Sequence, residues 1–166
     1  MKRLTPLAIV LLAALHLPAC EGSAQENLIA LERSMMQVSS RTERSAPVIE
    51  VQHILVAVKS QRMQDGLSQQ AAKALAADLL ARIKDDGDFI ALMKEHSKDP
   101  GSKNGGSYTM HDPKKGGEAP PGAQPRSGMV AAFGDVGWRL DVGDYGVSNY
   151  NQTSSPFGYH IIKRVR

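Results

Sequence analysis

The sequence has little cysteine, few aromatic residues and almost no excess of charge. A single cysteine among 166 residues, Cys20, excludes an internal disulfide. A hydrophobic content of 42% with an aromatic content of 5% indicates an ordinary globular composition with a modest core. The formal net charge is +3, and removal of residues 1–19, which contain Lys2 and Arg3, leaves 18 basic and 17 acidic residues. Such a balanced chain offers no basic face to the phosphates of a nucleic acid. Its length fits one domain.

The first 19 residues predict an export signal. A basic start precedes an apolar run from Leu4 to Leu15, which is too short to cross a bilayer comfortably. The following Leu17-Pro-Ala-Cys20 resembles a bacterial lipoprotein signal, which implies that Cys20 is lipidated and begins the mature chain. The alternative is an ordinary signal peptide with an incidental cysteine. We therefore expect a cell-envelope protein, lipid-anchored to a bacterial membrane, with its domain on the periplasmic or extracytoplasmic side.

Residues 20–47 are predicted to form a polar tether. They lack strand character, and only residues 27–36 favour a short amphipathic helix, through Leu28, Leu31 and Met35. A segment without a core of its own would hold the domain off the membrane. The folded domain is accordingly predicted over residues 48–166.

Two apolar runs, one near each end of this domain, each carry one histidine. Val51–Val58 is rich in β-branched residues and predicts a strand with mostly apolar faces, on one of which His53 lies. A second run, residues 158–165, has the same character and places His160 in phase with Ile162. If these strands are neighbours in one sheet, the two imidazoles can face each other.

The sequence between these strands predicts two helices and then an irregular region. Ser68 is a suitable N-cap for a helix that ends near residue 86, and Asp88 for a second helix. Residues 99–128 contain seven of the 15 glycines and five of the nine prolines, which excludes a long regular element. We expect about 110–127 to be an exposed insertion.

The order of these motifs resembles the parvulin family of peptidyl-prolyl cis-trans isomerases over about residues 48–166. The strongest matches are His53-Ile-Leu-Val56, His96-Ser-Lys-Asp-Pro-Gly-Ser102 and Pro156-Phe-Gly-Tyr-His-Ile-Ile162. Each motif is weak alone, and their joint order carries the resemblance. It implies an α+β fold in which about three to four helices surround a mostly antiparallel four-stranded sheet.

The resemblance also implies four catalytic positions. His53 and His160 would be paired imidazoles, hydrogen-bonded to each other at the centre of the sheet. Asp99 would lie near the substrate amide, and Ser155 would support the histidine pair. Without the resemblance, each histidine could be an ordinary core residue, and Asp99 beside Pro100 could simply end a helix.

Three further positions would bind the substrate. Met129 and Phe133 correspond to the apolar pocket that receives the proline ring, and Tyr108 corresponds to its rim. Outside the resemblance, Met129 and Phe133 could be plain core. The rim departs from the family, because Ser107-Tyr-Thr109 follows Gly-Gly where members often have Asp-Leu-Gly. A phosphate-directed specificity is not expected, since only Lys59 and Arg62 follow the first strand.

Prolyl isomerisation requires no bond cleavage. The barrier of about 18–20 kcal/mol reflects amide resonance, so an apolar pocket and a few fixed polar groups are enough to favour the twisted amide. We expect an isomerase of X-Pro bonds in unfolded or flexible exported polypeptides, with no cofactor or metal, acting as a monomer. The alternative function is a non-catalytic, parvulin-fold chaperone module that binds peptides, which the altered rim favours.

Overall fold

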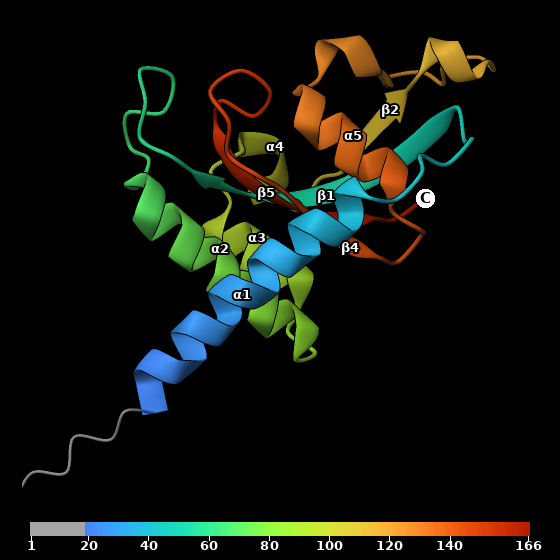
Figure 1. Cartoon of the computed structure of the whole chain (residues 1–166). Helices are drawn as coiled ribbons and strands as arrows, with labels where there is room; N and C mark the ends of the chain where they lie inside the picture. Colours follow the sequence, from blue (N-terminus) through green and yellow to red (C-terminus); the bar gives the residue numbers. More distant parts are fainter. Residues whose placement is uncertain (1–18) are drawn as a thin grey trace, which may run out of the picture.

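The computed structural model describes residues 19–166, which form a five-stranded sheet with helices on both faces (Figure 1). The strand order is β3-β2-β1-β5-β4. The strands are β1 (Val48–Ala57), β2 (Tyr108–His111), β3 (Gln124–Pro125), β4 (Tyr145–Ser148) and β5 (Gly158–Arg164). All pairs are antiparallel except β2 with β3. The predicted α+β class is confirmed, and the two-residue β3 is an addition to the four expected strands.

The central strands β1 and β5 bring the two histidines together. Their register pairs His53 with Ile162 and Leu55 with His160. The histidines are therefore diagonal neighbours whose side chains share one face of the sheet. The opposite face presents Ile54 and Ile161 to a core formed with α2 (Gln69–Lys84) and α3 (Phe89–His96).

Local capping fixes the helices between the central strands. The Ser68 hydroxyl accepts a hydrogen bond from the Ala71 amide at 3.2 Å, which begins α2. The Asp88 carboxylate accepts bonds from two amides in the first turn of α3. Both caps were predicted from the sequence. A further single turn, α4 (Pro100–Lys103), is capped by Asp99.

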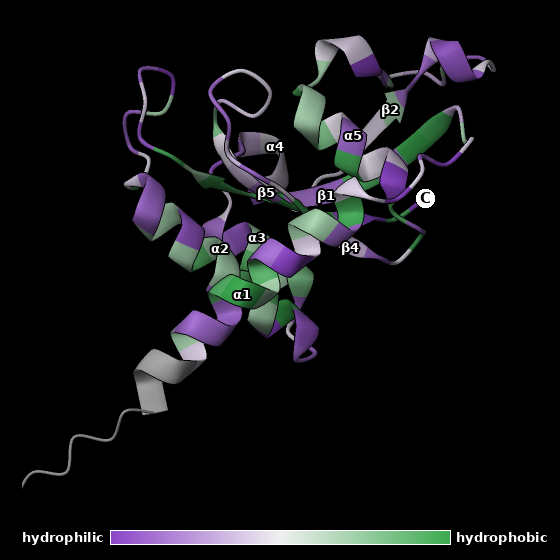
Figure 2. Cartoon of the chain, in the orientation of Figure 1, coloured by the Kyte–Doolittle hydropathy of each residue, from purple (hydrophilic) through white to green (hydrophobic). Residues whose placement is uncertain are grey.

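The histidine-bearing face is covered by α5 (Ala131–Arg139), which packs on it through Phe133 and Trp138. Both aromatic side chains are almost fully buried, and the Trp138 indole donates a hydrogen bond to the Ala46 carbonyl at 2.8 Å. Short 3-10 turns, η1 (Pro113–Lys115) and η2 (Arg126–Gly128), lie between β2 and α5. Figure 2 shows hydrophobic residues along β1 and where α1, α2 and α3 meet.

The prediction of a polar tether over residues 20–47 is wrong. The chain instead forms one long helix, α1 (Ala19–Ser39), whose later turns pack on α2 and β4. Leu31 is 0% exposed and Val38 is also buried, because Leu28, Leu31, Met35 and Val38 follow the three- and four-residue spacing of a helix face. The sequence predicted a short helix through the first three of these residues, but neither its full length nor its packing on the domain. The start of α1 projects from the domain (Figure 1).

The segment after α1 also lies on the domain. The Arg44 amide donates to the Trp138 carbonyl at 2.8 Å, and Arg41 forms an ion pair with Asp144 at 2.7 Å. The expected signal segment lies outside the described residues except for Ala19. Within residues 19–166, no helix is both long enough and apolar enough to span a membrane.

The expected insertion, about residues 110–127, is only partly exposed. Met110 and His111 belong to β2 and are buried, as is Asp112. The prediction of exposure fails at this end because the Asp112 amide donates to the Pro47 carbonyl and so continues the contact between β2 and the start of β1. Residues 116–119 are exposed as expected.

Candidate active site

A cavity of about 190 Å³ lies between the sheet and the start of α5. Its lining includes six of the seven predicted catalytic and substrate-binding residues: His53, Asp99, Tyr108, Met129, Phe133 and His160. Leu55, Val130 and Phe157, which were not predicted from the sequence, add apolar surface. The cavity is thus large enough for a small ring and mostly apolar.

The two imidazoles lie side by side but do not bond to each other. Their ring centroids are 5.2 Å apart, and both rings contact Phe133, at 4.8 Å from His53 and 5.5 Å from His160. Within residues 19–166 neither ring nitrogen of His160 has a hydrogen-bond partner. The expected hydrogen bond between the histidines is therefore not found, because the strand register offsets them diagonally.

Burial keeps both histidines uncharged at neutral pH. His53 is 3% exposed and His160 is 4% exposed. Removal from water lowers the pKa of His53 to about 4, although the nearby Asp99 charge opposes the shift. Burial also lowers the pKa of His160 well below its ordinary value, and the proximity of His53 adds to this effect. The histidines therefore contribute neutral rings to the wall of the cavity.

Asp99 begins a helix rather than ending one, since it caps α4, and its side chain also lines the cavity. Its carboxylate accepts a hydrogen bond from the Ser102 amide at 2.8 Å, and the Tyr108 hydroxyl donates to its two oxygens at 2.9 and 3.1 Å. Partial burial raises the pKa of Asp99, but the Ser102 amide, His53 and the Tyr108 hydroxyl together lower it below its usual value. A fixed negative charge therefore faces the cavity at neutral pH.

Ser102 joins Asp99 to the histidines and was missed from the sequence. Its side chain is fully buried, and its hydroxyl lies 3.1 Å from His53 Nδ1. The Asp-Pro-Gly-Ser motif could have indicated this residue. The amide of the third residue after a capping Asp donates a hydrogen bond to the Asp carboxylate, so Ser102 lies close to Asp99 at the start of the helix. The hydrogen-bonded chain runs from Tyr108 through Asp99 and Ser102 to His53.

Ser155 lies outside this chain of hydrogen bonds. Its buried hydroxyl donates to the Gly158 carbonyl at 2.9 Å and so shapes the turn that leads into β5. The expected direct support of the histidine pair is not seen. The Ser155 hydrogen bond instead holds the backbone at Gly158, two residues before His160.

Met129, Phe133 and Tyr108 form the proposed ring-binding wall. Phe133 is almost fully buried, and its ring meets that of Tyr108 edge-on at a centroid distance of 6.2 Å. Met129 is only partly buried, where the chain passes from η2 into α5. Burial and the Asp99 charge raise the pKa of Tyr108 to about 12, so its hydroxyl stays protonated as a donor.

An ion-pair cluster around Arg126 holds this wall in place. The guanidinium contacts Glu43 at 2.6 Å, Asp135 at 2.7 Å and Asp112 at 2.9 Å, and it lies 4.8 Å above the Trp138 ring. The hydrogen bond from Arg126 is the largest cause that lowers the pKa of Glu43 to about 2. These contacts join the segment after α1, the end of β2 and α5, which carries Phe133. These contacts could not be predicted from the sequence, since Glu43 and Arg126 are distant along the chain.

Among the described residues, no group of His, Cys, Asp and Glu side chains has an arrangement that could hold a metal ion. The polar groups of the cavity are the uncharged histidines and the Asp99 carboxylate with its donors. The arrangement can bind a small apolar ring and place a fixed charge and neutral rings beside it.

A mostly antiparallel sheet with adjacent histidines beside a ring-sized apolar cavity is typical of a parvulin-like domain. Residues 33–165 match the sequence model of the family described as the PPIC-type PPIASE domain. The chain belongs to this family of peptidyl-prolyl isomerase domains. The match begins inside α1, earlier than the boundary at residue 48 expected from the sequence.

Curated relatives carry this domain within longer proteins. The chain is 35% identical over 114 residues to "Chaperone SurA" of Chromohalobacter salexigens, covering 68% of this chain and 21% of the relative. It is 33% identical over 120 residues to "Foldase protein PrsA 4" of Bacillus cereus, covering 70% and 31%, respectively. The chain thus spans a fifth to a third of the length of these relatives.

A solved structure supports the fold. The "Peptidyl-prolyl isomerase ESS1 from Candida albicans" superimposes with a TM-score of 0.50 over 86% of this chain and 76% of that chain. The sequence identity is 22%, so the likeness concerns the fold alone. It agrees with the α+β architecture that the resemblance to parvulins implied.

Proposed function

We propose that this chain is a parvulin-type peptidyl-prolyl cis-trans isomerase that acts on X-Pro bonds of unfolded or flexible exported polypeptides. The observation that carries the proposal is the cavity of about 190 Å³, in which Phe133 and the neutral histidines face the Asp99 carboxylate. Membership of the PPIC-type family supports it. The names of the relatives, a chaperone and a foldase, support polypeptides as substrates.

The geometry favours the twisted amide over the planar one. In the planar amide, resonance places partial negative charge on oxygen and partial positive charge on nitrogen. Twisting reduces this separation of charge. Because the wall of Phe133, His53 and His160 excludes water, it raises the free energy of the twisted state less than that of the planar states. The Asp99 carboxylate further disfavours a negative carbonyl oxygen beside it. The Tyr108 hydroxyl, fixed on Asp99, keeps that charge in position.

We also propose that the domain is anchored through lipidated Cys20 at a membrane of the cell envelope. Cys20 falls in the first turn of α1, which continues into the packed domain at Leu31. At 1.5 Å per residue, the helix between them spans about 16 Å. The anchor would therefore connect to the domain through a continuous helix rather than a flexible linker.

The test is the exchange rate of short X-Pro peptides in the presence of the purified chain. Wild type should accelerate exchange, and Asp99→Ala should slow it by about tenfold, or roughly 1.4 kcal/mol of transition-state stabilisation. Binding of the peptide in the cavity without any acceleration would refute the isomerase.

The second candidate is a peptide-binding module without useful catalysis. The observation in its favour is the altered rim, where the Tyr108 hydroxyl hydrogen-bonds to both carboxylate oxygens of Asp99, which also accepts a bond from the Ser102 amide. This module would bind proline peptides with the same cavity residues but leave their exchange rate unchanged.

A further inference from the structure

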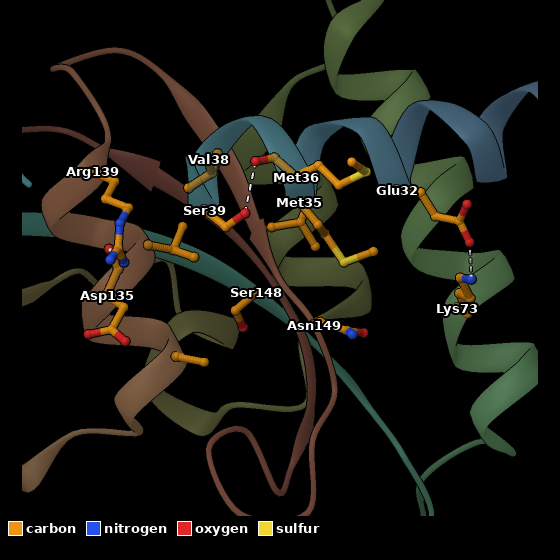
Figure 3. Close-up of a pocket in the computed structure, with 13 residues that line it drawn as sticks. Glu32, Met35, Met36, Val38, Ser39, Lys73, Asp135, Arg139, Ser148 and Asn149 are labelled. Carbon is orange, nitrogen blue, oxygen red and sulfur yellow. Dashed lines mark hydrogen bonds and ion pairs between the residues drawn. The ribbon is translucent and has the colours of Figure 1, made fainter. Parts of the chain in front are cut away.

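A second and larger hollow lies between α1, α5 and the end of β4 (Figure 3). Its volume is about 570 Å³, three times that of the candidate active site. It meets α5 at Ala132, Asp135, Val136 and Arg139, which share one helical face, whereas Phe133 points into the active-site cavity. We call this hollow the α1–β4 groove.

Flexible apolar side chains from α1 line the groove. Met36 is 71% exposed and Met35 is partly buried beside it, and Val38, Val136 and Val147 provide apolar surface around them. Unbranched methionine side chains adapt to partners of different shape. An exposed apolar site of this kind marks a binding surface more often than a scattered single residue does. The lining therefore suits apolar side chains without a strict sequence requirement.

A buried polar group in the same groove indicates a hydrogen-bonding occupant. Ser148 is buried, and its hydroxyl has no hydrogen-bond partner in the part of the chain that the structure describes. Buried hydroxyls are nearly always paired. Ser148 ends β4, the outermost strand on its side of the sheet, and Asn149 follows it in the lining (Figure 3). A polypeptide supplies both apolar side chains and hydrogen-bonding backbone groups.

The charges around the groove cancel. At one end Lys73 forms an ion pair with Glu32 at 2.5 Å, and at the other end Arg139 donates a hydrogen bond to the backbone carbonyl of Asp135 at 3.1 Å. Two acidic and two basic side chains give no net attraction for a polyanion or an anionic lipid surface. An uncharged segment complements this rim best.

The groove adjoins the candidate active site at two structural elements. Ala132 lines the groove and the next residue of α5, Phe133, lines the cavity. On the sheet, Ser148 in the groove is the strand partner of His160 in the cavity. A polypeptide whose proline occupies the cavity therefore has its flanking residues near the groove.

From these observations we infer that the α1–β4 groove is a second binding site for the client polypeptide, taking an extended, uncharged, largely apolar segment away from the proline. The inference rests on the proposed function in that the client is an unfolded, proline-containing polypeptide. It adds a site that lies partly on α1 and that a short peptide in the cavity would not occupy.

The experiment compares a four-residue X-Pro peptide with two longer versions. In these, about ten uncharged residues, which reach about 30 Å, extend the peptide on each side. One extension contains Leu and Val, and the other only Gly and Ser. With the full chain, we expect the Leu/Val peptide to bind more tightly than the Gly/Ser peptide.

Substitutions of Met36 and a matched control on the same helix locate the effect. Met36→Glu and Met36→Lys should each weaken binding of the Leu/Val peptide by at least about fivefold while leaving the exchange rate of the short peptide unchanged. Ile29 is also apolar and exposed, at 45%, but does not line the groove. Ile29→Glu and Ile29→Lys should therefore leave binding of the Leu/Val and the Gly/Ser peptides unchanged.

Three outcomes would overturn the inference. Equal effects of the Met36 and Ile29 variants, or none, would remove the groove from peptide binding. Opposite effects of Met36→Glu and Met36→Lys would show that charge, not apolar contact, drives binding. Self-association of the chain that Met36→Glu abolishes, with peptide binding unchanged, would assign the groove to a second copy. Binding of the Leu/Val peptide without accelerated exchange would instead refute the proposed isomerase and leave the groove standing.

Discussion

Acidification should destabilise the domain through the two buried histidines that line the cavity, His53 and His160. The unfolded chain takes up protons near pH 6.5, whereas the pKa of His53 in the fold is about 4 and that of His160 is also lowered. Stability is therefore fully present above about pH 6.5 and is lost as the pH falls toward 4. For His53 alone, acidification from pH 7.5 to about pH 5 removes about 2 kcal/mol, and His160 adds a further loss of the same sign.

Urea denaturation measured at intervals between these pH values tests this magnitude. The pKa values of Asp99 and Glu43 are lowered, so the stability linked to those carboxylates is retained above their unfolded values and is lost only at more acid pH. The loss of stability between pH 7.5 and 5 is therefore assigned to His53 and His160. We expect the urea midpoint to fall steadily with little change in the slope of the transition.

A variant at His160 provides the control. Neither of its ring nitrogens has a partner among the described residues, so His160→Leu removes a buried polar group without breaking a hydrogen bond. This variant should lose part of the pH dependence and be relatively more stable than wild type near pH 5. A wild-type midpoint that does not change between pH 7.5 and 5, or a His160→Leu variant with the full wild-type dependence, would refute the reasoning.

Three further predictions concern packing, the ion-pair cluster and the anchor. Leu31→Ala should cost about 2–5 kcal/mol of unfolding free energy in urea titrations, while the exposed Ile29→Ala should cost under about 0.5 kcal/mol. Arg126→Met should cost at least about 2 kcal/mol by the same measurement, because it leaves Asp112 buried without its cation, and Arg126→Lys should cost less. Cys20→Ala should abolish labelling with fatty acid and release the domain from membranes on fractionation; continued membrane association would contradict the anchor.

The sequence predicted the elements that depend on local pattern. The strands around His53 and His160 are continuous apolar runs, which is what burial on both faces of a sheet requires. The caps at Ser68 and Asp88 act within three residues, so the sequence contains all the information needed to place them. Six of the predicted residues line the cavity, and they were recognised because the motifs around them are short and occur in a fixed order.

The features that were missed depend on contacts between distant segments. The packing of α1 could not be recognised from a mostly polar segment, because Leu31 and Val38 are buried only when α2 and β4 are present. The Arg126 cluster joins three segments that approach only in the fold. The Ser102 hydroxyl contacts His53 because α4 packs against β1. The expected bond between the histidines is absent because the strand register offsets them by two residues.

The central claim is that the wall at Phe133 catalyses isomerisation, and exchange of an X-Pro peptide followed by NMR tests it most directly. Trp138→Phe is the matched control, since Trp138 is equally buried on α5 but does not line the cavity. Phe133→Leu should reduce catalytic efficiency by at least about tenfold with a small loss of stability. Trp138→Phe should lower the melting temperature but retain activity while folded. Wild-type chain that leaves the exchange rate unchanged, or a Phe133→Leu variant as active as wild type, would contradict the claim.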